Sequence, residues 1–272
     1  MKIILLVRYS YVFPEAEAGV FVASQASRAD YIAGILDPSR LKLRDFLFRN
    51  VLLESLRAQT VDLDPSWFRL AIATSHHLPQ AARNDLEEAV RPYPWAKIEV
   101  DRSFADITTG FLKETAASGP VCFGSMRIDD DDALGRPYLE SVIPYCSDPY
   151  VDHILSFPAG YVARFKTKQL RLKRFGYRYH PLNSAGMTYV GRFDPATGSM
   201  TSRKSDIFAA GSHARIDRDF PVISSARQPM FLRCIHGSQD TAADSREELR
   251  QSHPVAVEQV LKHVALSPIL LG

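Results

Sequence analysis

Four consecutive aspartates, Asp129 to Asp132, are the residues of this sequence that point most clearly to a chemical function. They directly follow the apolar run Val121–Ile128, which has the length and composition of a buried strand. Adjacent carboxylates repel one another, and the repulsion grows where they are desolvated. A hard divalent cation removes this cost, because such cations prefer carboxylate oxygens as ligands. The acidic string therefore predicts a cation site, and a solvated acidic turn is the alternative.

Two common motifs do not explain the acidic string. An EF-hand loop needs aspartates at alternate positions, Gly at the sixth position and Glu at the twelfth. Counted from Asp130, the sixth residue is Gly135, but the fifth is Leu134 and the twelfth is Ser141. The sequence also contains no G-x-x-x-x-G-K-[ST] motif, which disfavours ordinary kinases and NTPases.

The first half of the chain alternates short apolar runs with amphipathic segments. Strands are expected at Ile3–Val7, Phe68–Ala73, Lys97–Val100 and Val121–Ile128. Helices are expected after the Asp37-Pro38 cap, where two apolar rows recur (Leu43-Leu47-Val51 and Phe48-Leu52-Leu56), after Pro79, and over Phe104–Ala117. This alternation predicts an α/β fold, a parallel sheet with helices on both faces.

Ligands of such sheets bind beyond the carboxyl ends of the strands. The topology alone therefore places three segments on one edge of the predicted sheet: Arg8-Tyr9-Ser10, Ser75-His76-His77 and Asp129–Asp132.

The second half of the chain has shorter apolar runs with antiparallel potential. Strands are expected at Ile154–Phe157, Tyr161–Phe165, Phe175–Tyr179 and Gly186–Arg192. Ser245 and Glu248 have the spacing of a capping box, which predicts a helix start that Pro254 later interrupts. Because no repeat, linker or low-complexity tract separates the halves, we expect residues 1–272 to form a single domain with one core.

Composition narrows the class of protein. With 272 residues, 46% hydrophobic residues and a formal net charge of +2, the chain is neither disordered nor basic enough to suggest a nucleic-acid partner. Cys122, Cys146 and Cys234 lie far apart and predict neither a disulfide framework nor a zinc site. The run Ile3–Val7, stopped by Arg8, is too short for a signal peptide or a membrane span. We therefore expect a protein of a bacterial-type cytoplasm.

Three motifs resemble those of the bacterial putative rhamnosyltransferase family. They are RIDDDDAL at 127–134, SLRAQT at 55–60 and FLRCIHGSQ at 231–239, and the resemblance extends from about residue 28 to residue 245. A strand followed by Asp-x-Asp is also similar to the metal signature of nucleotide-sugar glycosyltransferases with the GT-A fold. The resemblance implies a GT-A-like, Rossmann-type mixed sheet, with 1–132 as the nucleotide-binding half and 133–272 as the acceptor-side half. One departure is Ser238-Gln239, because the family usually has Asn after the late His-Gly.

The resemblance also implies a nucleoside-diphosphate sugar as donor and Mn²⁺ or Mg²⁺ as cofactor, since a cation neutralises the diphosphate leaving group. It assigns Arg8, Asp129 and Asp130 to the donor, and Asp131 and Asp132 to the metal, although the four aspartates are exchangeable on sequence grounds.

Histidines and a further pair of aspartates complete the candidate site. His236 is similar to a late histidine that completes the metal shell in several GT-A enzymes, and the alternative is a structural histidine bonded to a backbone carbonyl. His213 is a candidate for substrate contact, whereas His76-His77 is expected to be a loop pair. Asp217 and Asp219 are candidates for the base of an inverting transfer, and surface aspartates are the alternative.

A basic stretch runs from Arg164 to Arg178 without any acidic residue. Its alternating part predicts a strand with one charged face. A solvated hairpin explains such a stretch, and the functional alternatives are an anionic acceptor or peripheral contact with the inner face of an anionic membrane.

The sequence thus predicts a metal-dependent glycosyltransferase of cell-surface polysaccharide synthesis. It would move a sugar, rhamnose by the family's name, to a glycan or lipid-linked acceptor. Two alternatives stand beside it: a non-catalytic metal- or nucleotide-binding module, and a metal-dependent nucleotidyl or phosphoryl transferase.

Overall fold

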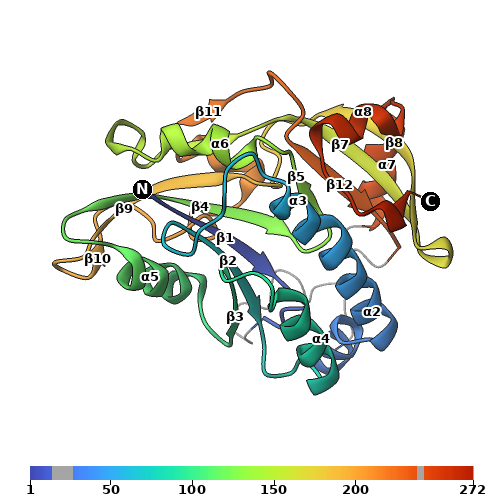
Figure 1. Cartoon of the computed structure of the whole chain (residues 1–272), viewed down its shortest axis with the longest axis horizontal. Helices are drawn as coiled ribbons and strands as arrows, with labels where there is room; N and C mark the ends of the chain where they lie inside the picture. Colours follow the sequence, from blue (N-terminus) through green and yellow to red (C-terminus); the bar gives the residue numbers. More distant parts are fainter. Residues whose placement is uncertain (14–26, 238–241, 272) are drawn as a thin grey trace.

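The computed structural model describes residues 1–13, 27–237 and 242–271, which form two β-sheets and the helices that cover them (Figure 1). The larger sheet takes strands from both halves of the chain, and the smaller sheet lies beside it with the C-terminal helices. The two halves of the chain therefore contribute residues to the same hydrophobic clusters on the larger sheet, in agreement with a single mixed α/β domain.

The larger sheet has the strand order β11-β6-β9-β4-β1-β2-β3, with β10 paired to β9. Its strands are β1 (Lys2–Arg8), β2 (Phe68–Thr74), β3 (Ala96–Val100), β4 (Val121–Asp129), β6 (Ile154–Ser156), β9 (Thr188–Asp194), β10 (Ser199–Met200) and β11 (Val222–Ser224). The first four are parallel, which confirms the prediction for the first half, and β9 runs antiparallel to β4. Ile3 to Val7 are fully buried, as expected of a parallel strand that is covered on both faces.

Helices cover both faces of the larger sheet. The helices are α1 (Arg28–Ile35), α2 (Pro38–Leu47), α3 (Glu54–Arg57), α4 (Gln80–Val90), α5 (Phe104–Thr115), α6 (Tyr138–Val142), α7 (Ala242–Gln251) and α8 (Val257–His263). Short 3-10 turns occur at η3 (Ile143–Tyr145), η4 (Asp148–Tyr150), η5 (Thr167–Gln169), η6 (His213–Arg218) and η7 (Pro268–Leu270). Leu5 and Val7 of β1 pack on the side of α2 and α4, whereas Ile4 and Leu6 pack on the side of α5. Within the described residues, no helix is both long enough and apolar enough to cross a membrane.

The helix after Asp37 packs between the two sheets. The Asp37 carboxylate accepts hydrogen bonds from the backbone N–H groups of Ser39 and Arg40, as an N-cap should. The helix continues from α2 through a π-turn (η2, Phe48–Leu53) into α3. The row that contains Leu47 faces the core of the smaller sheet, and the row that contains Leu52 faces the core of the larger one. The two apolar rows in the sequence thus reflect two packing surfaces.

The smaller sheet has the order β13-β8-β7-β12-β5. Its strands are β5 (Ala133–Leu134), β7 (Ala159–Lys166), β8 (Arg171–Tyr179), β12 (Phe231–Ile235) and β13 (His253–Pro254). Because β5 follows β4 after only three residues, the acidic string lies at the junction of the two sheets.

The C-terminal helices correct one prediction. The chain leaves α7 at Gln251 and enters α8 at Val257, so Pro254 interrupts the helix as expected. However, α7 already begins at Ala242, so Ser245 lies inside the helix and does not cap its start. Glu248 forms an ion pair with Arg233 of β12.

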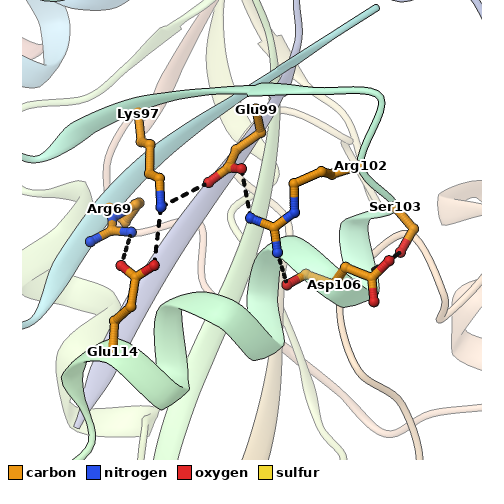
Figure 2. Close-up of polar contacts among 7 residues, drawn as sticks. All are labelled: Arg69, Lys97, Glu99, Arg102, Ser103, Asp106 and Glu114. Atoms are coloured by element: carbon orange, nitrogen blue, oxygen red, sulfur yellow. Dashed lines mark hydrogen bonds and ion pairs between the residues drawn. The ribbon is translucent and has the colours of Figure 1, made fainter.

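A network of charges attaches α5 to β2 and β3 (Figure 2). Glu114 of α5 lies 2.7 Å from Arg69 and 3.0 Å from Lys97, and Glu99 lies 2.7 Å from Arg102. Ser103 caps α5 by accepting a hydrogen bond from the Asp106 N–H. The carboxylates of Glu99 and Glu114 thus each contact two cations.

Candidate functional site

The acidic string occupies the predicted edge of the larger sheet. In the parallel register, Arg8 of β1 is the partner of Ala73 on β2 and of Asp129 on β4. The carboxyl ends of these three strands therefore meet, which confirms the expected edge.

Most of the acidic string is buried. Asp130, Asp131 and Asp132 are only 1%, 2% and 3% exposed. The alternative of a solvated acidic turn is therefore wrong for these three residues, because each carboxylate has lost its water and needs partners within the protein.

Arg44 of α2 supplies the main positive charge beside the string. Its Nη1 donates to Oδ1 of Asp130 and lies 3.1 Å from Oδ2 of Asp131. Burial nevertheless raises the pKa of Asp130 to about 7, because the Arg44 charge only partly offsets desolvation and the nearby Asp131 adds repulsion. The second carboxylate oxygen of Asp130, Oδ2, is buried without a hydrogen-bond partner among the described residues. One guanidinium thus serves two crowded carboxylates.

His236 meets Asp131 directly. Its Nε2 lies 2.6 Å from Oδ2 of Asp131, and its side chain is fully buried at the end of β12. Burial alone would raise the pKa of Asp131, but Arg44 and the His236 hydrogen bond outweigh burial and hold this pKa below its usual range. Asp131 is therefore the most firmly ionised carboxylate of the three buried ones. The structure brings together two of the three residues that were predicted to bind metal, Asp131 and His236.

Asp132, the third, has a different environment. Its Oδ1 accepts a hydrogen bond from the Cys234 backbone N–H at 3.0 Å. Burial, with repulsion from Asp131, raises its pKa well above the usual value. This bond joins the string to β12, and the metal-binding role of Asp132 stays a prediction.

Asp129 is the accessible member of the string. Its side chain is 42% exposed and lies 3.7 Å from Arg8. Arg8 and Arg127 both lie over the ring of Phe208, at 5.3 Å and 4.8 Å from its centre. Burial lowers the pKa of the Arg127 guanidinium to about 10. Two cations and an aromatic ring thus surround the exposed carboxylate.

His213, at the start of η6, belongs to the same neighbourhood. Burial, and then the positive charge of Arg127, lower its pKa to about 4, while Asp129 opposes the shift. His213 is therefore a neutral imidazole at physiological pH.

Three buried hydroxyls lie at the same edge. Ser10 comes shortly after β1, Thr74 is the last residue of β2, and Ser75 follows it. Their side-chain hydroxyls have no hydrogen-bond partner among the described residues. Ser10 also has a φ of 42°, in the left-handed region that non-glycine residues seldom adopt. Buried unpaired hydroxyls are uncommon, so these three groups are candidates for contact with a ligand.

The other predicted residues lie apart from the string. Asp217 and Asp219 are exposed on and just after η6, and no contact in the described residues joins them to the acidic string. His76 binds Asp101 at 2.8 Å, and His76 and His77 are exposed in a loop, as expected.

Sequence reasoning missed Arg44 and Arg233. Arg44 lies four residues before Phe48 and so continues a row that is otherwise apolar, Phe48-Leu52-Leu56. A charged residue in a buried row requires a buried partner, and this signal was present in the sequence. Arg233 lies one residue before Cys234 in the FLRCIHGSQ motif and carried no such signal.

These features define an α/β protein with a cluster of buried charges at the carboxyl edge of a mixed sheet. The chain belongs to the family described as "Putative rhamnosyl transferase", whose model matches residues 2–248. No curated protein matches the sequence significantly.

Several solved structures are similar to this chain. S. aureus TarS is 11% identical with a TM-score of 0.41, and the match covers 86% of this chain and 37% of TarS. TarS 1-349 in complex with UDP is 12% identical with a TM-score of 0.41, over 86% of this chain and 61% of that one. A putative glucose-1-phosphate thymidylyltransferase from Bacillus anthracis, in complex with a sucrose, is 10% identical with a TM-score of 0.33, over 92% of this chain and 96% of that one. The chain thus spans well under two thirds of TarS, and at these TM-scores the similarities carry no functional argument.

Proposed function

We propose that this protein is a GT-A-type glycosyltransferase that moves a sugar from a nucleoside-diphosphate sugar to an acceptor hydroxyl. Membership of the family supports sugar transfer, and rhamnose as the sugar rests on the family's description alone. The observation that carries the proposal is the buried contact between Asp131 and His236 at the carboxyl edge of the parallel strands. The fold does not need a buried pair of an ionised carboxylate and an imidazole at this edge of the sheet, where ligands bind, so the pair supports a functional role.

The residues fit a divalent cation that has two protein ligands. Oδ2 of Asp131 and Nε2 of His236 are donors that Mn²⁺ or Mg²⁺ accepts, and Arg44 keeps Asp131 ionised. Within the described ranges, no three His, Cys, Asp or Glu side chains are grouped as a complete metal site. A cation here would take its remaining ligands from the donor and from water. When bound, it would neutralise the diphosphate leaving group.

The donor's other parts would meet residues of the larger sheet. Arg8 beside Asp129 offers positive charge to the diphosphate, and the free hydroxyls of Ser10 and Thr74 offer hydrogen bonds to the nucleoside. Asp129 is the exposed carboxylate that could accept hydrogen bonds from the ribose hydroxyls.

The transfer itself exchanges one C–O bond for another. The acceptor oxygen forms a bond to the anomeric carbon, while the bond from that carbon to the diphosphate oxygen breaks and the nucleoside diphosphate leaves with the electron pair. The hydroxyl proton passes to a base, and for an inverting transfer Asp217 and Asp219 stay the residues to test.

Nucleoside diphosphate binding tests the metal part of the proposal. UDP, dTDP and GDP should raise the melting temperature only with Mn²⁺ or Mg²⁺ present, and a ligand at 100 times its Kd adds about 2.7 kcal/mol of stability. Asp131→Asn should remove this metal-dependent shift, because a carboxamide neutralises no charge. Asp62→Asn, the same substitution at an exposed position before β2, is the matched control and should keep the shift. An unchanged shift in both Asp131→Asn and Asp129→Asn would contradict the proposal.

Product analysis separates the proposal from its two alternatives. A glycosyltransferase slowly hydrolyses its donor and releases a nucleoside diphosphate. A nucleotidyl or phosphoryl transferase would release pyrophosphate or phosphate instead, and a binding module would give no turnover.

A further inference from the structure

The hairpin of β7 and β8 gathers four positive side chains on one face. In its antiparallel register, Arg164 lies opposite Lys173, and Lys166 lies opposite Arg171. Residues two apart on a strand share a face, so these four side chains form a single basic face. Like charges directly opposite each other destabilise a hairpin, and here two such pairs are adjacent.

The register of the hairpin is held by the opposite face. Phe165 and Leu172 are cross-strand partners, and both are buried in the core that also contains residues of α2 and α8. Slipping by one residue would expose this pair, so the chain cannot relieve the repulsion by changing register.

The basic face has no carboxylate partner within residues 1–13, 27–237 and 247–271. In the described parts of the chain, none of its four residues forms an ion pair, whereas the neighbouring Arg233 is paired with Glu248. The sequence contains no acidic residue from Arg164 to Arg178. The face therefore carries concentrated positive charge, which suits the binding of an anion.

A cavity of about 440 Å³ lies between part of the basic face and His236, the residue that contacts Asp131. Arg164, Lys166 and Lys168 line it from the hairpin. His236, whose ring contacts Asp131, lines it from the end of β12 together with Ile235 and Gly237. Ile235 is the parallel register partner of Arg164, so the cavity lies at the carboxyl ends of two adjacent strands of one sheet.

We propose that this cavity binds a phosphate ester carried by the acceptor substrate. The inference rests on the proposed function, which places the donor diphosphate at Asp131 and His236. The acceptor oxygen must reach the anomeric carbon of the donor sugar, which is bonded to the diphosphate. The cavity borders His236 on the side of the smaller sheet, so an acceptor held there would lie beside the donor. The volume accommodates a phosphate with an attached polyol or sugar.

A phosphate ester matches the lining better than a carboxylate does. Its several oxygens can each accept a charge-assisted hydrogen bond from a different cation. Arginine presents a planar fork of donors and lysine a point charge, and both types line the cavity. The ester could belong to a soluble phosphodiester chain or to a lipid-linked carrier, and both sources share this chemistry.

Calorimetric titration with glycerol 3-phosphate, without donor and without metal, tests the site. The wild type should bind at low salt, and added salt should weaken binding because it screens exposed charges. Lys166→Gln/Lys168→Gln should weaken binding by at least about tenfold. Lys42→Gln/Lys113→Gln removes the same charge from exposed positions on α2 and α5 and should bind like the wild type. Equal affinity in all three proteins, or no binding by the wild type, overturns the proposal.

Two further measurements separate the rival explanations. In Lys166→Gln/Lys168→Gln, the metal-dependent affinity for a nucleoside diphosphate should change less than about twofold. If this variant lost affinity for the nucleoside diphosphate but kept its affinity for glycerol 3-phosphate, the cavity would belong to the donor and the proposal would be overturned. Co-sedimentation with phosphatidylcholine vesicles that contain phosphatidylglycerol provides the membrane arm. Vesicle binding without glycerol 3-phosphate binding would replace the proposal with a membrane-contact surface, whereas binding of both supports a lipid-linked source. Because the titration needs no donor, its result is independent of whether the protein transfers a sugar.

Discussion

Two charged regions of this protein contain similar residues in opposite arrangements. In the network that attaches α5 to β2 and β3, the carboxylates of Glu99 and Glu114 each lie between two cations (Figure 2). These two carboxylates do not touch each other. In the acidic string, three buried carboxylates follow one another, and Arg44 contacts two of them. The same residue types thus form a balanced network in one place and a crowded one in the other.

The pKa values express this difference. A hydrogen bond from Arg69 lowers the pKa of Glu114, with Lys97 adding to the effect. In the string, burial raises the pKa of Asp130 while Arg44 and His236 hold that of Asp131 below normal. Neighbouring carboxylates with pKa values pulled apart are typical of ligand and catalytic sites, whereas uniformly stabilised ones are typical of structural ion pairs. Arrangement, not charge count, distinguishes the two regions.

Removing the cation from each region gives the largest expected effect. Arg44→Met leaves two buried carboxylates without their guanidinium and should lower the free energy of unfolding by about 3–5 kcal/mol. Lys97→Met, on a side chain that is 42% exposed, leaves Glu114 with Arg69 and Glu99 with Arg102, and should cost about 1 kcal/mol or less. Urea unfolding of the metal-free proteins measures both. Equal costs would mean that the two regions do not differ as described.

The sequence predicted the elements of the larger sheet well because their signals are local. The apolar run Ile3–Val7 and the Asp37-Pro38 cap each specify an element without reference to distant residues. Because parallel strands end at one edge, the elements alone also placed Arg8 beside Asp129.

Long-range pairing was harder to predict. The β7–β12 pair joins residues that are about 70 positions apart, and nothing in either segment indicates that they form a second sheet. The Ser245–Glu248 spacing misled because a capping box is only a four-residue pattern, and Glu248 is used by Arg233 instead. Arg44 lies 86 positions from Asp130, so only its place in an apolar row could have pointed to the acidic string.

A pH titration sharpens the comparison from the side of the string. The pKa of His213 is about 4 in the folded protein, lowered by burial and by Arg127, against 6.5 for an ordinary histidine. Between these values His213 binds more protons in the unfolded chain than in the folded one, so its contribution to stability rises with pH from 4 to 6.5 and falls as the pH is lowered. His213→Gln should remove this pH dependence. Between pH 4 and 6.5 the dependence amounts to roughly 1 kcal/mol in the free energy of unfolding, after allowance for the partial exposure of the ring.

Unfolding by urea at a series of pH values measures the slope. His253→Gln, an exposed histidine on β13, is the matched control for the loss of one imidazole. If His213→Gln and His253→Gln changed the slope equally, the neighbourhood of Asp129 would not have the unbalanced charge described for it.

The smallest effect is expected in the α5 network, and its dependence on salt and pH is the informative part. The Glu114 side chain is 47% exposed, so Glu114→Gln should cost about 0.5 kcal/mol at low ionic strength. Screening should reduce this cost in high salt, whereas the cost of Arg44→Met should persist because buried pairs are screened much less. Because the pKa of Glu114 is lowered in the folded protein, its contribution is present above the pKa of the unfolded chain and is lost as the pH falls through the folded-state value. If the loss of stability caused by Glu114→Gln did not decrease in high salt, the α5 network would be as desolvated as the acidic string. Solvent exposure would then not explain the difference between the two regions.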